Sequence, residues 1–227
     1  MEELINLEVL YEDNHLIAVD KPVGLLIQED ASGDPSLLDA VRHYLKGKYH
    51  KPGKVYLGLI HRLDRPVGGV VLLGRTSKGS ARLSEQFREH SVEKTYHALV
   101  EGTPPASGRW EHHLEDRGLG QAVGVVGAET PGAKRAVLSF RTLQQGAKFA
   151  LVEVKLETGR KHQIRAQFAA MGHPLAGDHK YGGRIPFGAD GIGLVAYSLA
   201  FSHPTRPEER IVVQVRHEPR QTWAAWL

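Results

Sequence analysis

Nine short apolar runs constrain the fold of this 227-residue chain more than any other feature. Their residues alternate between apolar and polar or are rich in β-branched side chains, and Gly, Pro or Asp bounds each run, which is typical of β-strands joined by turns. The runs span residues 7–13, 15–20, 55–60, 68–74, 94–100, 135–143, 149–157, 193–201 and 210–216. The sequence therefore predicts a chain rich in β-strands.

Three segments instead repeat their apolar residues at the spacing of a helix. These segments span residues 36–45, 77–90 and 159–172. Ser36 and Asp39 have the spacing of a capping box, and a short C-terminal helix is expected to dock Trp223 and Trp226 on the core. Strands that follow strands with few helices indicate an α+β fold, in which packed helices cover a mixed, largely antiparallel sheet.

The chain shows no separate module and no convincing linker, so a single domain over residues 1–227 is expected. Residues 102–134, with short polar strands between turn residues, are predicted to form a protruding hairpin. The Gly-rich residues 181–193 are predicted to be a mobile loop. Long loops in a compact domain are often functional, so either segment could line a cleft.

Composition narrows the class of protein. The chain has no Cys, an acidic N-terminal segment unlike an export signal, and no apolar run near the roughly 18 residues of a membrane span. We therefore expect a cytoplasmic protein without a membrane partner. The net charge is only +3, but basic residues cluster in "RHYLKGKYHKPGK" and "RKHQIR". Such clusters fit a phosphate-rich partner, although a basic run is more often a solvated helix face.

The stretch "LGLIHRLDRPVGGVVLLGR" places one acid, Asp64, between Arg62 and Arg65 in a polar gap that separates two apolar runs. Gly68 and Gly69 follow and permit tight backbone geometry. One interpretation is a turn acid paired with the neighbouring arginines. The other is a functional carboxylate held where strands end and a cleft can open.

The segment "ETGRKHQIRAQFAAMG" predicts a helix that starts near Gly159, with Ile164, Phe168 and Met171 forming its buried stripe. His162 and Arg165 share an adjacent face.

Arg160 and Lys161 would lie in the first turn of this helix, where the macrodipole favours acids. A bound anion such as phosphate would compensate these cations, and so would an acid such as Glu157.

Other motifs carry less weight. In "EKTYHALVEG", strand alternation puts Tyr96 on one face with Ala98 and Val100, where a tyrosine is most often a core residue. The thirteen histidines show no zinc-ligand spacing, so metal catalysis is not expected. The sequence also has no GxxxxGK[ST], GxGxxG or GxSxG motif.

In order along the chain, "HRLDRPVGG", "EKTYHALVEG" and "TGRKHQIRAQFAAMGHPLAGDHKYGG" resemble three successive motifs of the RluA-type pseudouridine synthases. The early "LYEDNHLIAVDKPVGLLI" and the late "LVAYSLAFSHP" resemble further segments of that family. The chain departs from the family pattern at Val67, Gly68 and Gly69, where Thr-Ser-Gly is usual, and at Gln167, where His is common. The resemblance implies the pseudouridine synthase fold with a catalytic cleft, here without the small N-terminal S4-type RNA-binding domain of some relatives.

The resemblance also implies an activity, the isomerisation of uridine to pseudouridine in RNA, with no cofactor and no metal. By resemblance Asp64 is the catalytic carboxylate, Tyr96 stacks on the target base, and Arg165 is the basic partner of the acid. The substrate-binding residues that the resemblance implies are Arg62, Leu63, Arg160, His162, Gln163 and Ile164. Arg62 would support flipping of the nucleotide and Ile164 would line the uracil pocket.

The expected partner is transfer RNA, ribosomal RNA or both, and the expected state is a monomer without an obligate protein partner. Two alternatives belong to other classes. One is a catalytically silent RNA-binding protein of the same fold, although binding alone does not require an acid that repels phosphate. The other is a metal hydrolase of small phosphorylated substrates, which lacks a ligand motif.

Overall fold

The structure, a computed structural model, describes residues 7–50, 52–118, 120–187 and 191–227. The chain folds into two units. Unit 1 holds the residues up to Val92 together with Ala196–Arg216, and unit 2 holds Glu93–Val195 and His217–Leu227. The single domain expected over residues 1–227 stays a prediction. No helix in the described ranges is long and apolar enough to cross a membrane.

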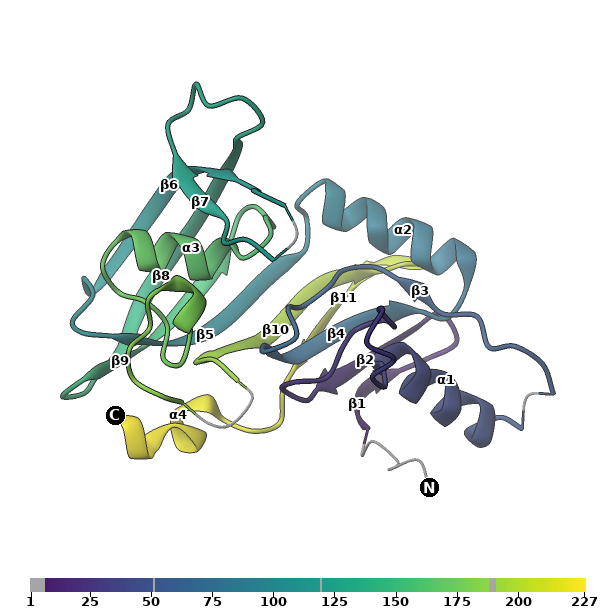
Figure 1. Ribbon diagram of the computed structural model, residues 1–227. Helices are drawn as coiled ribbons and strands as arrows, with labels where there is room; N and C mark the ends of the chain where they lie inside the picture. Colours follow the sequence, from purple (N-terminus) through teal and green to yellow (C-terminus); the bar gives the residue numbers. More distant parts are fainter. Residues whose placement is uncertain (1–6, 51, 119, 188–190) are drawn as a thin grey trace. The chain divides into compact units, whose positions relative to one another are not determined.

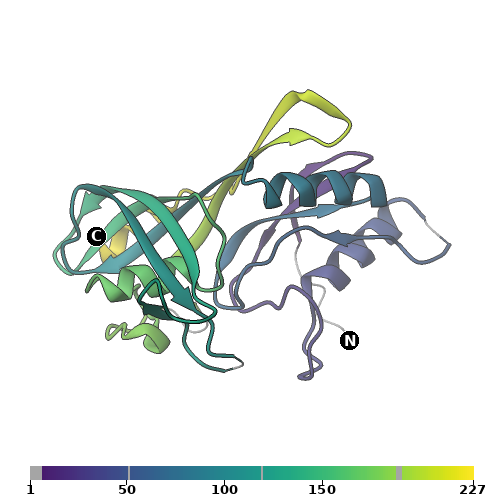
Figure 2. The ribbon, with the colours of Figure 1, turned by 90° about the horizontal axis from the view of Figure 1, so that it is seen from above.

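Unit 1 is built on a sheet in the strand order β1-β2-β4-β10-β11, with β3 also paired to β4. The strands are β1 (Glu8–Glu12), β2 (Leu16–Lys21), β3 (Gly58–Leu59), β4 (Gly68–Gly74), β10 (Leu194–His203) and β11 (Arg206–Gln214). The pairs β1–β2, β2–β4, β3–β4 and β10–β11 are antiparallel. Figure 2 shows the β10–β11 hairpin, in yellow-green, standing out from the unit.

Two helices complete unit 1, α1 (Leu37–Lys48) and α2 (Ser77–Arg88). Every residue of β4 is buried, and so are the first four of β2, so both faces of these strands need cover. Figure 1 shows α1 and α2 on either side of them. Ser36 caps α1, because its hydroxyl accepts from the Asp39 backbone N–H at 3.3 Å, and Asp39 interacts with Ser36 through the hydroxyl, to which its carboxylate is an acceptor.

Unit 2 is built on an antiparallel sheet in the order β5-β9-β8-β6-β7. The strands are β5 (Glu93–Glu101), β6 (Ser107–Glu115), β7 (Gly124–Val126), β8 (Lys134–Gln145) and β9 (Phe149–Leu156). The helical elements are α3 (Gln163–Ala170), η1 (His179–Tyr181), α4 (Pro219–Thr222) and η2 (Ala224–Trp226). Figure 1 shows α3 lying against the sheet.

Aromatic packing fastens α3 to the sheet of unit 2. The Phe168 ring lies 4.8 Å from that of Trp110 and 5.6 Å from that of Phe140, measured between centroids. The helix buries all six residues from Gln163 to Phe168, polar ones included, so it is a core helix with no solvent-exposed face over this stretch. The predicted buried position of Met171 is wrong, because this residue ends the helix and is 43% exposed.

The α+β fold is confirmed, and the predicted strands and helices are present with different bounds. The run at residues 55–60 forms only the short β3, while the predicted hairpin of residues 102–134 contains the antiparallel pair β6–β7. Trp223 is buried as expected. The predicted mobile loop includes residues 188–190, which lie outside the described residues.

Gly69 is required where β4 begins. Its φ is +113°, and a Cβ there would lie 2.3 Å from the carbonyl oxygen of Ala196. We expect Gly69→Ala to lower the free energy of unfolding by about 3 kcal/mol or more, because it adds backbone strain and a clash. Urea denaturation measures this.

Gly33→Ala is the matched control for Gly69→Ala. Gly33 also has a positive φ, +75°, but a Cβ there would meet nothing within 4 Å. This variant is expected to lose only about 1 kcal/mol, the cost of the left-handed backbone alone. Equal losses in the two variants would contradict the close approach of β4 to β10.

Candidate active site

Asp64 lies in unit 1 on the turn that leads into β4. The Val67 backbone N–H donates to the Asp64 carbonyl at 3.0 Å and closes the turn. Asp64 is half-buried, Leu63 beside it is 8% exposed, and Arg62 is exposed. The predicted location of the acid, where a buried strand begins, is therefore correct.

The neighbouring Arg65 has partners in the segment that follows β2. Its Nη2 forms an ion pair with Asp34 at 2.8 Å, and its Nε donates to the carbonyl of Gly24 at 2.9 Å. The Gly24 backbone N–H donates in return to the Arg65 carbonyl at 2.9 Å. Arg65 therefore fastens the Asp64 turn to residues 24–34.

A buried lysine holds the same turn from inside. Lys21, the last residue of β2, has no exposed surface, and its Nζ donates to the carbonyls of Pro22 at 2.9 Å, Leu25 at 2.8 Å and Arg65 at 3.1 Å. An ammonium group has three N–H donors, so these bonds use all of them. Because the acceptors are neutral, they orient the cation without neutralising it.

The charge of Lys21 interacts with that of the candidate acid. Burial lowers the pKa of Lys21 to about 8, and the negative charge of Asp64 acts in the opposite sense. The two charges attract each other, so unit 1 presents a desolvated cation to its candidate catalytic carboxylate.

Tyr96 lies in unit 2 on β5, opposite Val154 of β9, and is half-buried. Strand alternation puts Lys94 and Ala98 on the same face as Tyr96. Lys94 is 7% exposed, and burial lowers its pKa. The backbone of Tyr96 is therefore held in the sheet of unit 2 by the pairing of β5 with β9.

The start of α3 differs from the prediction. The helix begins at Gln163, and its N-cap, His162, has a left-handed backbone with φ +52°. Arg160 and Lys161 therefore precede the helix. Arg160 Nε donates to the carbonyl of Arg135 at 3.0 Å, and Lys161 Nζ donates to Asp116 Oδ1 at 2.8 Å.

The inference of a bound anion rested on two cations in the first turn of this helix, and that premise is wrong. Glu157, the acid that we considered as an alternative partner for them, instead forms a two-bond ion pair with Arg109, with both distances 2.9 Å. The compensating acid for Lys161 is Asp116, which is distant in the sequence.

A buried amide explains where α3 begins. Gln163 Oε1 accepts from the Thr158 hydroxyl at 2.8 Å and from the Arg160 backbone N–H at 3.0 Å, while its Nε2 donates to the Val137 carbonyl at 3.0 Å. Gln163 thus braces the turn before the helix against β8. Ile164, the next residue, is 4% exposed.

Arg165 is held by a residue outside the helix. Its Nε lies 2.7 Å from Asp178 Oδ2 and its Nη2 lies 2.9 Å from Asp178 Oδ1, which makes a bidentate pair. The two side chains are 7% and 1% exposed. The Arg165 guanidinium also lies over the Tyr181 ring, with Cζ 4.9 Å from its centroid.

Tyr181 connects Arg165 with His162. The Tyr181 hydroxyl lies 2.7 Å from His162 Nδ1 and accepts from the Val123 backbone N–H at 2.8 Å. The structure therefore gathers His162 and Arg165 around one tyrosine.

Sequence reasoning missed Lys21, Asp178 and Tyr181 as functional candidates. Asp178 and Tyr181 lie within the quoted segment "GDHKYGG" and only needed to be singled out as an acid and an aromatic near the predicted helix. Lys21 ends an alternating apolar strand. The sequence could not predict that it is buried, because lysine is normally exposed. Within the described ranges, no three His, Asp or Glu side chains group to hold a metal ion.

The chain is similar to known proteins of one family. Residues 15–170 match the RNA pseudouridylate synthase family. A ribosomal large subunit pseudouridine synthase D from Zymomonas mobilis is 34% identical over 78% of this chain and 56% of its own length. A tRNA pseudouridine synthase C from Yersinia pestis is 31% identical over 95% of this chain and 88% of its own length.

Solved structures show the same fold. The human RNA pseudouridylate synthase domain containing 4 superimposes with a TM-score of 0.76 over 93% of this chain and 88% of its own length, at 23% identity. The chain belongs to the RNA pseudouridylate synthase family. It spans only about half the length, 56% and 55%, of two of the synthase D relatives.

The role of Lys21 can be tested through stability. We expect Lys21→Met to lower the free energy of unfolding by about 2–4 kcal/mol at pH 7, because buried carbonyls lose their donor. Between pH 8 and 10.5 the unfolded chain binds more protons at this lysine than the folded chain, since the folded pKa is about 8 against 10.5. Lys21 therefore makes the parent more stable as pH rises through this window.

The difference in free energy of unfolding between the parent and Lys21→Met should be constant below pH 8 and should widen toward pH 10.5. Urea denaturation across this range measures it. Lys54→Met, at an exposed lysine of the same unit, is the control and is expected to change stability by less than about 0.5 kcal/mol at every pH. A deficit that shrinks as pH rises would contradict the burial of a charged Lys21.

Proposed function

We propose that this protein isomerises specific uridines in RNA to pseudouridine, with Asp64 as the catalytic carboxylate. Membership of the RNA pseudouridylate synthase family carries the proposal. The Asp64 turn supports it, because a buried ammonium and an ion-paired arginine hold this acid in place. Such preorganisation is typical of groups that act in a reaction.

The reaction breaks the N1–C1′ glycosidic bond, turns the uracil within its site, and joins C5 to C1′. The C5 hydrogen leaves as a proton and N1 gains one, so the reaction has no redox change and consumes no water. One carboxylate suffices, either by attacking the sugar or the base or by removing a ribose proton in an elimination. We leave these routes open for Asp64.

The target atoms are inaccessible in a stacked RNA helix, so the nucleotide must be flipped out at a cost of a few kcal/mol. We assign Tyr96, a half-buried aromatic residue of β5, to stacking on the flipped base. The exposed Arg62 is assigned to the RNA backbone or the vacated stack. Ile164 is assigned to the uracil pocket and Leu63 to substrate binding, as the family's motifs imply.

Arg165 is assigned as the basic partner of the acid, and His162 and Arg160 to contacts with RNA. Gln163 was predicted to bind substrate, and we propose that it does so indirectly, by holding the turn that carries Arg160 and His162. These assignments come from the family's motifs and stay predictions until variants are measured.

The relatives' names include both a ribosomal large subunit and a tRNA pseudouridine synthase. We propose transfer RNA, ribosomal RNA or both as the substrate, and hence the cytoplasm as the compartment. RNA phosphates would be bound by arginines and lysines of both units, which makes binding salt-dependent. A monomer without an obligate protein partner remains our expectation.

Asp64→Asn tests the proposed function. We expect it to reduce tritium release from RNA labelled at uridine C5 by at least about 1,000-fold, because the amide cannot act as a nucleophile or base. RNA affinity should stay within about threefold, since the change removes no cation from the phosphate-binding surface. Bulk transfer and ribosomal RNA serve as substrates, with excess EDTA present.

Glu85→Gln is the matched control, because it makes the same chemical change at an exposed site on α2 of the same unit. It should retain the parent's rate. An active Asp64→Asn variant would contradict the catalytic assignment. No release by the parent, together with salt-sensitive RNA binding, would favour the catalytically silent RNA-binding protein.

A further inference from the structure

Arg165 can assist the proposed reaction only if its guanidinium points in one direction, and two neighbouring side chains determine that direction. We propose that Asp178 and Tyr181 are positioning residues for Arg165, an inference that rests on the proposed function. Neither needs to touch RNA, because both act through the guanidinium.

Asp178 fixes the guanidinium against rotation. Two parallel bonds, of 2.7 and 2.9 Å, engage Nε and Nη2 of Arg165. A single hydrogen bond would let the planar group turn about it, whereas a bidentate pair sets both its place and its plane. The pair also directs the remaining N–H donors of Arg165 away from Asp178.

The backbone in turn holds Asp178 in place. Its carbonyl accepts from the N–H groups of Tyr181 and Gly183, both at 2.9 Å. A Cβ at Gly183 would lie 2.5 Å from the Leu175 carbonyl oxygen, so this turn closes only around a glycine. The turn is therefore a rigid support for the carboxylate.

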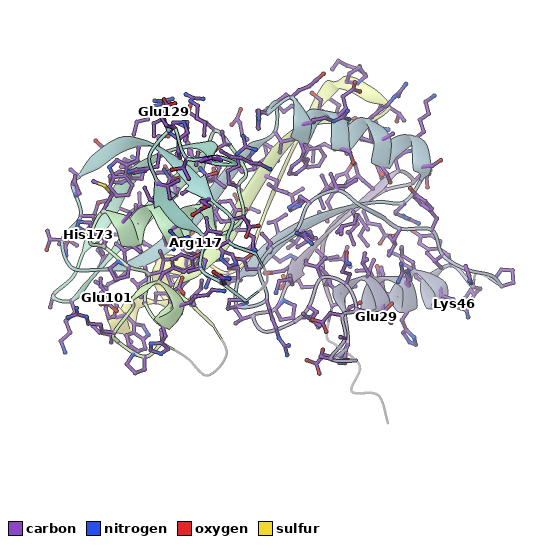
Figure 3. All side chains as sticks on the ribbon, turned by 45° about the horizontal axis from the view of Figure 1, so that its top comes forward. Glu29, Lys46, Glu101, Arg117, Glu129 and His173 are labelled. Atoms are coloured by element: carbon purple, nitrogen blue, oxygen red, sulfur yellow. The ribbon has the colours of Figure 1, made fainter. Side chains whose placement is uncertain are left out.

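The chain that follows this turn is anchored to the sheet of unit 2. Glu101 of β5, labelled in Figure 3, accepts from the Arg184 and Ile185 N–H groups at 2.7 and 3.0 Å. The support beneath Arg165 therefore continues to β5 of the unit 2 sheet.

Tyr181 closes the other side of the guanidinium. Its ring lies under Arg165, with Cζ 4.9 Å from the centroid, and packs on an apolar cluster. That cluster consists of Leu114, Val123, Ala136 and Ala166. The hydroxyl of Tyr181 is fixed by the Val123 N–H and by His162 Nδ1.

The Tyr181 hydroxyl also supports His162, a predicted substrate-binding residue. His162 has a left-handed backbone, φ +52°, that a side chain with a Cβ rarely adopts. Its 2.7 Å contact with Tyr181 helps to hold it there. One tyrosine therefore sets the place of two candidate site residues.

Stability alone does not explain this cluster. Desolvation offsets most of the attraction in a buried ion pair, and an apolar pair of similar volume is often at least as stable. The apolar neighbours of Tyr181 could accommodate such a pair. What an apolar pair cannot supply is a fixed direction for a guanidinium.

Single-turnover tritium release from RNA labelled at uridine C5, measured well below each variant's melting temperature, tests the inference. Asp178→Asn keeps the volume but loses the charge, and should slow the reaction about 10- to 100-fold, as misplacement of a reacting group does. Its RNA affinity should stay within about threefold of the parent's, since the rate and not the binding depends on orientation. Tyr181→Phe keeps the ring and should slow the reaction about three- to tenfold.

The decisive comparison is made in the Arg165→Met background. If Asp178 acts only through Arg165, Arg165→Met/Asp178→Asn should be no slower than Arg165→Met alone. Asp116→Asn is the matched control, because Asp116 forms an exposed ion pair with Lys161 in the same unit. Its rate should stay within about twofold of the parent's.

Three results would overturn the inference while leaving the proposed function intact. They are the parent's rate in Asp178→Asn, the parent's rate in Arg165→Met, and a further loss when Asp178→Asn is added to Arg165→Met. If Asp178→Asn fails to fold, Tyr181→Phe provides the test instead. The inference is then overturned if Tyr181→Phe reacts as fast as the parent. No release by the parent itself would refute the proposed function, and the inference with it.

Discussion

The candidate site depends on how the structure accommodates two of its buried cations, Lys21 in unit 1 and Arg165 in unit 2. Lys21 gives its three donors to neutral carbonyls, so its charge is oriented but not cancelled. Arg165 is paired with the carboxylate of Asp178, so its charge is largely compensated. The first arrangement supplies an electrostatic field to the Asp64 turn. The second supplies little net field but holds a planar group in one orientation.

Both arrangements rely on backbone groups more than on side chains. Lys21 is held by main-chain oxygens, and Asp178 is held by a turn that closes around Gly183. Main-chain groups in a closed turn have few alternative positions, whereas long side chains have many. A site supported in this way is preorganised without additional charges, which would have to be desolvated in turn.

The sequence predicted the α+β fold and most elements because strand alternation and helix periodicity record burial directly. The prediction failed where contacts between residues distant in the sequence determine the local structure. The start of α3 is set by Gln163, whose amide reaches Val137 of β8, and the cation of Lys161 is neutralised by Asp116, which is far away in the sequence. Local rules for helix termini could not anticipate these contacts. The family motifs contained Asp178 and Tyr181, but their contacts with Arg165 required coordinates.

Two acids with lowered pKa values belong to exposed ion pairs of unit 2. Ion pairs lower the pKa values of Glu111 and Glu157, and both acids are exposed, Glu111 on β6 and Glu157 just after β9, where they hold Arg135 and Arg109. Such carboxylates are stabilised as anions and are correspondingly weak bases. The Asp64 turn is distinguished instead by a base, Lys21, whose pKa burial lowers to about 8. In this protein the useful electrostatic signal is therefore the desolvated cation beside the candidate acid.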